Sequence, residues 1–416
     1  MPELFKPMFI PPVDAPAVVA LANTLLPVLG QTLYNVRDIH VGPEAKERLE
    51  TIRAGRALLC PNHPTEEDPI VMYWLSRNMG MRFNYLAARD AMDGPRGWWM
   101  NRLGAYSVIR GGVDREALRA TRKLLAELDR KVVIFPEGAV YEHNDALMVF
   151  QSGVAQIGFW SVEDLHKAGK KAELPLLPVA IKYRLTDSPR PTIESSLRAL
   201  EEALGLHAAP KLGQYQRLLR LGDRLLCSME GYESVKRVEG ADLPTRVRAV
   251  RQAVTSRVAR AIGTEVRTAE PPADQLHHLF NELRAWVGRP PDDASPYEER
   301  LYRKKLQVSA PLFEDLQRLA NFIMFTGDYV AAEATAERFL EVLGRLEKEV
   351  LGEVRHRVPR EALVRIAPPI RMEERYDAYR ENKRQAVADV TREVEGSIRS
   401  MLQELSREAT PISLEA

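Results

Sequence analysis

Short apolar runs alternate with amphipathic stretches over roughly the first 190 residues. The apolar runs predict strands at 39–41, 56–60, 82–88, 106–109, 132–135 and 176–183. Helical spacing of apolar residues between the runs predicts helices at 69–79, 95–103, 114–129 and 146–165. Strands that are apolar along their whole length and separated by helices are typical of a sheet buried on both faces. The predicted fold class is therefore α/β, with a mixed sheet flanked by helices.

The pattern becomes helical beyond this region. From 191 to 355 almost no strand signal is found, and chain breakers divide the stretch into six or seven helices. A strand-like run follows at 361–370, and then a long charged helical pattern. Because an isolated strand is not stable beside helices alone, we expect this run to rejoin the first sheet. The predicted α/β domain thus comprises 38–190 plus 356–416, interrupted by a large all-helical insertion at 191–355.

The N-terminal segment, residues 1–37, carries an apolar helical stretch at 15–30. Prolines and a glutamate precede it, which makes a poor signal peptide. It is also shorter than the roughly 18 apolar residues that a membrane span needs. Two interpretations stay open: a helix packed on the protein, and a helix lying in the membrane interface.

Composition narrows the function classes only slightly. Apolar residues make up 45% and charged residues 28% of the 416, as in an ordinary folded protein. A net charge of +1 excludes a general polyanion binder, so no nucleic-acid partner is expected. The two cysteines, Cys60 and Cys227, are far apart, and no Cys/His cluster has the spacing of metal ligands. A reducing cytoplasm is therefore favoured.

The sharpest chemical signal directly follows the strand at 56–60. The motif NHPTEED places His63 and Asp68 five positions apart across a strand-to-helix turn. A carboxylate against an imidazole fixes the tautomer and stabilises the imidazolium, so the histidine can take a proton from an alcohol. A plain cap of the helix that starts near Pro69 is the alternative for Asp68.

Three further motifs lie at strand ends. GAYSVIRGG carries Arg110 out of a strand, and an arginine fork suits phosphate oxygens, unless the residue is simply on the surface. FPEG places Glu137 and Gly138 at the sheet edge where α/β proteins bind ligands, or forms an ordinary turn. LLPVAIKY, at 176–183, either lines an acyl pocket or belongs to the core.

In order and approximate spacing, NHPTEED, GAYSVIR, FPEG and LLPVAIKY resemble the motifs of the glycerolipid acyltransferases. This family contains lysophosphatidate and glycerol-3-phosphate acyltransferases. The segment FQSGVAQIGFW at 150–160 and the late strand VRIAPPI also resemble it. The resemblance covers about 40–190 and 358–408, whereas the helical insertion matches nothing in the family.

The resemblance implies an O-acyltransferase of phospholipid biosynthesis, similar to the lysophosphatidate acyltransferases. It would move a fatty acyl group from acyl-CoA or acyl-carrier protein to a hydroxyl of a (lyso)glycerophospholipid-type acceptor. His63 would be the general base and Asp68 its orienting partner. The residues implied in substrate binding are Asn62, Arg110, Glu137, Gly138, Pro178 and Lys182. Because the alkoxide attacks the thioester directly, neither a metal nor a cofactor is expected beyond the thioester co-substrate.

One departure from the family concerns the acceptor. The family continues FPEG with a hydroxyl residue and an arginine, where this chain has Ala139 and Val140. The lost arginine weakens the case for a simple glycerol-phosphate acceptor. Two other functions stay open: a lipid- or protein-binding protein on an acyltransferase fold, and an acyl-thioester hydrolase. The presence of both His63 and Asp68, which folding does not require, favours the transferase.

A lipid substrate predicts a peripheral position on the inner face of the membrane. Segment 82–131 holds 11 Lys/Arg against 6 Asp/Glu, with Trp98 and Trp99 among them. Basic residues beside tryptophans suit an anionic headgroup layer, although the tryptophans could equally belong to the core. The five arginines at 245–263 form a further candidate for lipid or partner contact, but a solvated charged face is the favoured interpretation.

Overall fold

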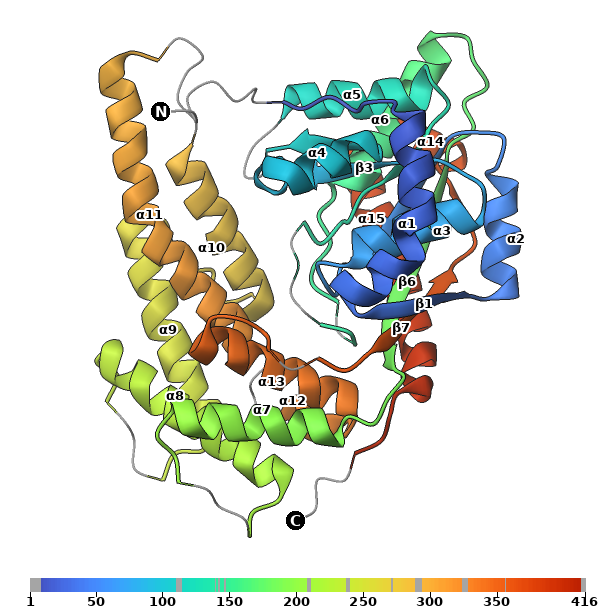
Figure 1. The fold of residues 1–416 in the computed structure, drawn as a ribbon. Coiled ribbons are helices and arrows are strands. Elements are labelled where there is room, and N and C mark those ends of the chain that lie inside the picture. Colours follow the sequence, from blue (N-terminus) through green and yellow to red (C-terminus); the bar gives the residue numbers. More distant parts are fainter. Residues whose placement is uncertain are drawn as a thin grey trace. The chain divides into compact units, whose positions relative to one another are not determined.

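The computed structural model divides the chain into two compact units (Figure 1), Met1–Asp187 with Pro359–Ala409 and Ser188–Val358 with Thr410–Ala416. The described residues are 9–109, 114–138, 140, 143–145, 147–207, 211–236, 240–270, 272–288, 294–323, 328–355 and 357–412.

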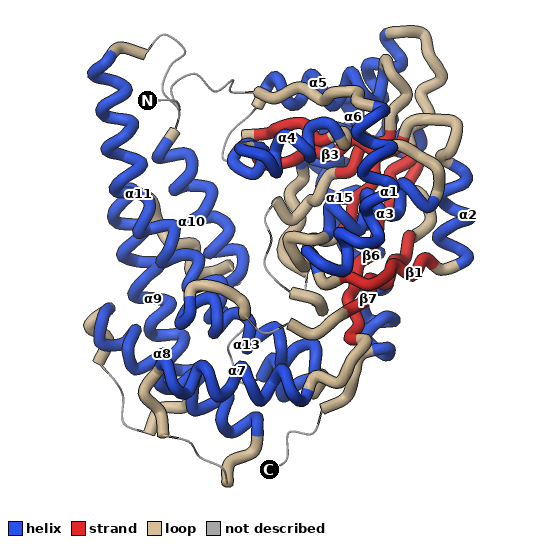
Figure 2. Tube along the Cα trace, in the orientation of Figure 1, coloured by secondary structure: helices blue, strands red, loops and turns tan. Residues whose placement is uncertain are grey.

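Eight strands form one sheet in the first unit (Figure 2, red). They are β1 (Val36–Val41), β2 (Ala57–Pro61), β3 (Phe83–Ala88), β4 (Ala105–Val108), β5 (Lys131–Val133), β6 (Pro175–Leu185), β7 (Arg360–Ile366) and β8 (Ile370–Arg371). Their order across the sheet is β1-β7-β6-β2-β5-β3-β4, and β8 pairs with β6. β6 runs antiparallel to β7 and β8, and the other pairs are parallel. The predicted fold class, a mixed α/β sheet with a helical insertion, is confirmed.

β7 follows the second unit in the chain, yet it lies inside the sheet between β1 and β6. Its register with β6 runs from Val179↔Ile366 to Leu185↔Arg360. The prediction that the late apolar run rejoins the first sheet is therefore confirmed. The run at 361–370 is not one strand, however. A double proline separates β7 from β8, because proline has no N–H to donate to a ladder.

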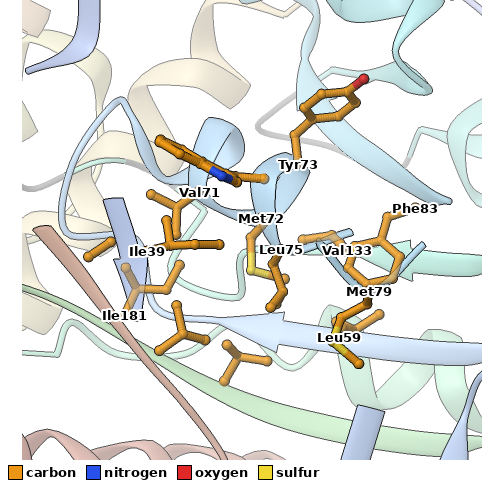
Figure 3. Close-up of a cluster of buried hydrophobic side chains, with 14 of the residues drawn as sticks. Ile39, Leu59, Val71, Met72, Tyr73, Leu75, Met79, Phe83, Val133 and Ile181 are labelled. Atoms are coloured by element: carbon orange, nitrogen blue, oxygen red, sulfur yellow. The ribbon is translucent and has the colours of Figure 1, made fainter. Parts of the chain in front are cut away.

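Helices cover both faces of the sheet. They are α1 (Pro16–Tyr34), α2 (Pro43–Thr51), α3 (Asp68–Asn78), α4 (Gly94–Arg102), α5 (Arg115–Ala126), α6 (Gly153–Lys167), α14 (Tyr376–Glu381) and α15 (Lys383–Leu405). In β2, Leu59 packs in a core with residues of α3 (Figure 3). Ala57 and residues of α1 and α2 belong to the same core. Leu58 and Cys60 pack in a second core with α5, α6 and α15. Burial on both faces explains why this strand is apolar at every position.

Two predicted helices have different bounds in the structure. The helix expected at 146–165 begins only at Gly153. The residues before it are held by the FPEG turn, where the Gln151 N–H donates to the Pro136 carbonyl at 2.8 Å. The pattern after the late strand breaks at Asn382, whose side chain caps α15 by accepting from the Gln385 N–H at 3.1 Å.

The second unit is built from helices. Those described are α7 (Arg190–Ala203), α8 (Gln214–Tyr232), α9 (Leu243–Ile262), α10 (Pro272–Val287), α11 (Pro296–Ile323), α12 (Asp328–Ala332) and α13 (Ala336–Leu351). One apolar core lies among α8, α9, α10 and α11, and another among α7, α8, α12 and α13.

Two of the five arginines of α9 are committed to ion pairs inside the second unit. Arg246 is buried and lies 2.7 Å from Glu230 of α8. Arg257 lies 2.6 Å from Glu233 and 2.9 Å from Asp315. These two side chains therefore hold helices together, and they do not belong to a basic surface on α9.

α1 contains no charged residue and presents two different sides. Ala22 and Leu26 are buried against the rest of the unit. Leu21, Leu25 and Val28 are 50%, 41% and 62% exposed. One side of the helix therefore packs on the protein, while the other is apolar and accessible. Among the helices of the described residues, none combines the length and the apolarity needed to cross a membrane.

α4 also exposes large apolar side chains. Trp98 is 45% and Trp99 38% exposed, with their rings in an edge-on arrangement. The alternative that placed these tryptophans in the core is wrong.

Candidate active site

The loop between β2 and α3 carries the candidate base, and Asn62 fixes this loop to β6. The Asn62 N–H donates to the Val179 carbonyl at 3.3 Å. In its side chain, Nδ2 donates to the Ile181 carbonyl at 3.0 Å, and Oδ1 accepts from the Ile181 N–H at 2.7 Å. Asn62 thus extends the pairing of β2 with β6 by one residue. This geometry supports a role for Asn62 in positioning the loop. It does not support the substrate contact that the resemblance implied.

His63 and Asp68 are in direct contact. Nδ1 of His63 lies 2.8 Å from Oδ2 of Asp68, whose side chain is completely buried, while the imidazole keeps 12% exposure. Phe135 of the FPEG turn stacks on the imidazole, with ring centroids 4.1 Å apart. Because the carboxylate engages Nδ1, the nitrogen that can take a proton from a substrate is Nε2.

The Asp68 carboxylate accepts three further hydrogen bonds. The Tyr183 hydroxyl donates to Oδ1 at 2.7 Å, the Thr65 hydroxyl to Oδ1 at 3.1 Å, and the Thr65 N–H to Oδ2 at 2.8 Å. Burial of a carboxylate is costly unless such donors compensate it. These donors come from the loop and from β6. A plain cap of α3 therefore does not account for Asp68.

Glu137 holds the same loop through the backbone of His63. Its Oε1 accepts from the His63 N–H at 2.7 Å, and its Oε2 accepts from the Met148 N–H at 3.2 Å. The side chain is 3% exposed. Burial raises the pKa of Glu137 to about 8, although both N–H donors act in the opposite direction. Glu137 therefore ties the FPEG turn to the candidate base.

Gly138 allows this turn to close. Its φ of +71° lies in the left-handed region that glycine adopts without strain. A Cβ at this position would lie 2.0 Å from Nε2 of Gln151. The conformation and the close approach both require glycine here.

The two predicted substrate contacts on β6 lie inside the sheet. Pro178 is buried opposite Cys60 of β2. Lys182 forms an ion pair with Asp145, and both side chains are 1% exposed. Because this partner already compensates the ammonium group, the arrangement does not support a phosphate contact from Lys182. Arg110 lies outside the described residues.

The residues missed by the sequence analysis are Thr65, Tyr183 and Asn144. The side chain of Asn144 pairs with the backbone of Tyr183. Asn144 Nδ2 donates to the Tyr183 carbonyl at 2.7 Å, and Asn144 Oδ1 accepts from the Tyr183 N–H at 2.6 Å. The two-residue period of β6 could have indicated which face Tyr183 occupies. Val179, Ile181 and Tyr183 alternate along the strand, and all three lie in the core that also contains α3.

The chemistry that this arrangement offers is general-base catalysis. An imidazole oriented by a buried carboxylate can accept a proton from a hydroxyl that reaches its outer nitrogen. Burial and the Asp68 carboxylate raise the pKa of Tyr183 well above its usual range, so the phenol keeps its proton and can donate it in a hydrogen bond. Among the described residues, no group of three or more His, Cys, Asp or Glu side chains is arranged to hold a metal ion.

We predict that Glu137→Gln flattens the pH dependence of folding stability. The pKa of Glu137 is raised from 4.5 to about 8 in the folded state. Between these values the folded protein holds a proton that the unfolded chain has lost. The wild type should therefore lose stability as pH rises, by up to about 1.4 kcal/mol per pH unit.

Urea unfolding of both proteins from about pH 5 to about pH 8 measures this effect. Because glutamine does not titrate, the stability of Glu137→Gln relative to the wild type should increase with pH. Parallel stability curves over this range would contradict the burial-driven shift.

A family model described as Acyltransferase matches residues 43–182, from the start of α2 into β6. The matched segment contains His63, Asp68 and the FPEG turn. No significant match was found among curated proteins. The family match supports acyltransferase activity in general terms and agrees with the resemblance read from the motifs. Residues 43–182 are thus similar to the acyltransferase family.

Proposed function

We propose that this protein transfers a fatty acyl group from acyl-CoA or acyl-carrier protein to a hydroxyl of a lysoglycerophospholipid-type acceptor. The observation that carries the proposal is the 2.8 Å contact between Nδ1 of His63 and the buried Oδ2 of Asp68. This pair lies within the segment that matches the acyltransferase family.

In the proposed reaction, Nε2 of His63 takes the proton of the acceptor hydroxyl as its oxygen attacks the thioester carbonyl. The new ester C–O bond forms, the C–S bond breaks, and His63 returns the proton to the departing sulfur. Asp68 stabilises the intermediate imidazolium. General-base catalysis of this kind contributes about 10²–10⁴ in rate, and holding the two substrates together contributes more.

The acceptor that we propose carries a headgroup larger than glycerol phosphate. The arginine that the family has after FPEG is replaced by Val140, and Lys182 is paired with Asp145. Both features reduce the positive charge available for a small phosphate monoester. Arg110 is the residue that we propose for contact with the acceptor's phosphate.

We predict that His63→Ala lowers acyl transfer by about 10²–10⁴ while the protein stays folded. Purified protein is mixed with acyl-CoA or acyl-carrier protein and a panel of lysolipids, and both free thiol and new lipid are followed. The wild type should form lipid and release thiol only when an acceptor is present. His207→Ala, at an exposed position in the second unit, serves as a control and should keep full activity.

Each other outcome of this assay has a clear meaning. Thiol release without new lipid would indicate a thioester hydrolase, and neither product would indicate a binding protein. A wild-type rate from His63→Ala would show that the base is wrongly assigned.

We also propose that the protein contacts the membrane peripherally through the exposed side chains of α1 and α4. Trp98 and Trp99 suit the headgroup region, and the Arg102 guanidinium lies 3.8 Å from the centre of a Trp98 ring. Arg96 lies 3.8 Å from Glu66, so α4 is close to the loop that carries His63.

Fewer basic residues support this contact than the sequence suggested. Arg82, Arg89, Arg122, Arg130 and Lys131 of segment 82–131 make hydrogen bonds to parts of the first unit outside α4. Arg102 donates within α4, to the Trp98 carbonyl at 3.4 Å, and so stays beside the tryptophans. The proposed contact therefore depends mainly on aromatic and apolar side chains, with Arg96 and Arg102 beside them.

We predict that replacing both Trp98 and Trp99 by alanine weakens binding to phosphatidylglycerol-containing vesicles by roughly tenfold, about 1.4 kcal/mol. Co-sedimentation of the full chain with vesicles measures this binding. Leu128→Ala, which alters a side chain that is 50% exposed elsewhere on the first unit, should bind like the wild type. Equal binding by the double variant and the wild type would exclude this surface.

A further inference from the structure

Tyr183 is held rigidly beside the His63–Asp68 pair. It lies in β6, is 3% exposed, and has both of its backbone polar groups bonded to the side chain of Asn144. Its hydroxyl donates to Oδ1 of Asp68 at 2.7 Å. The phenol therefore has one fixed position, with its donor directed at the carboxylate.

A second strand fixes the aromatic ring. The guanidinium of Arg360, the first residue of β7, lies 4.1 Å from the centre of the Tyr183 ring. The same guanidinium lies 3.0 Å from Oε2 of Glu67, the neighbour of Asp68 in the chain. Arg360 thus contacts both the phenol ring and the residue that precedes α3.

We infer that Tyr183 is a positioning residue for the proposed base, acting on His63 through Asp68. The inference rests on the proposed function of the His63–Asp68 pair. The hydroxyls of Tyr183 and Thr65 both reach Oδ1 of Asp68, which leaves Oδ2 directed at Nδ1 of His63. Without the Tyr183 hydroxyl, the carboxylate would lose its shortest contact on Oδ1, and the imidazole that it holds would be less precisely oriented toward the substrate.

The hydroxyl also moderates the charge that His63 experiences. A donor on Oδ1 draws negative charge away from the oxygen that faces the imidazole. Its removal should leave more negative charge on Oδ2 and make Asp68 a stronger partner for a protonated imidazole. Among the described residues, the other titratable groups that interact with this cluster include Glu67, Arg360 and Glu137, and Glu395 of α15 acts on Glu137.

The test is Tyr183→Phe, which keeps the ring and its contact with Arg360 and removes only the hydroxyl. Initial rates of acyl transfer are measured across pH for the full chain, with KM and kcat separated. We expect kcat to fall about tenfold with little change in KM. We also expect the acid limb of the kcat profile to move to higher pH by about half a unit to one unit.

Tyr85→Phe is the matched control, because Tyr85 is another buried tyrosine of the same sheet. It should leave kcat and the pH profile as in the wild type. A merely structural hydroxyl at Tyr183 would lower the melting temperature without moving the acid limb, and that result would overturn the inference.

A second variant keeps the test decisive if Tyr183→Phe does not fold. Thr65→Val removes the other side-chain donor to Oδ1 and should move the acid limb in the same direction by a smaller amount. An unmoved limb would overturn the inference. Full activity of His63→Ala would instead overturn the proposed function, so the two failures are distinguishable.

Discussion

The fully buried carboxylate of Asp68 is the group on which the candidate site depends. Burying a charged group has an unfavourable desolvation free energy. Hydrogen bonds from His63, Thr65 and Tyr183 compensate it at Asp68. These donors come from the loop after β2 and from β6. The orientation of His63 therefore depends on the positions of both elements. Asparagine side chains secure this placement at two points, because Asn62 pairs with the backbone of Ile181 and Asn144 with that of Tyr183.

The order of strands explains how a helical unit can interrupt this domain. β6 is flanked by β2, which leads into the loop of His63, and by β7, which follows the second unit in the chain. The chain leaves and re-enters the first unit at adjacent points, since the Thr186 N–H donates to the Pro359 carbonyl at 2.9 Å. Closely spaced ends allow a long insertion without disturbing the sheet. β7 is nevertheless part of the site, because its first residue, Arg360, contacts the Tyr183 ring.

Apolar periodicity predicted most of the sheet, because strands buried on both faces carry an unbroken apolar run. The spacing of His63 and Asp68 across a strand-to-helix turn also predicted their contact. It could not predict the partners that lie far away in the sequence. Tyr183 is 115 positions from Asp68, and only the register of β6 brings the two together. The same holds for Lys182, for which the resemblance implied a substrate contact, because its ion-pair partner Asp145 could not be identified from the sequence.

Whether His63 and Asp68 act as one unit is the central claim, and a double-mutant cycle on acyl transfer tests it most directly. The rates of His63→Ala, Asp68→Asn and the double variant are compared with the wild type. If the carboxylate acts only through the imidazole, the double variant should be no slower than His63→Ala alone. Losses that multiply in the double variant would show that the two residues act independently, and would contradict this account.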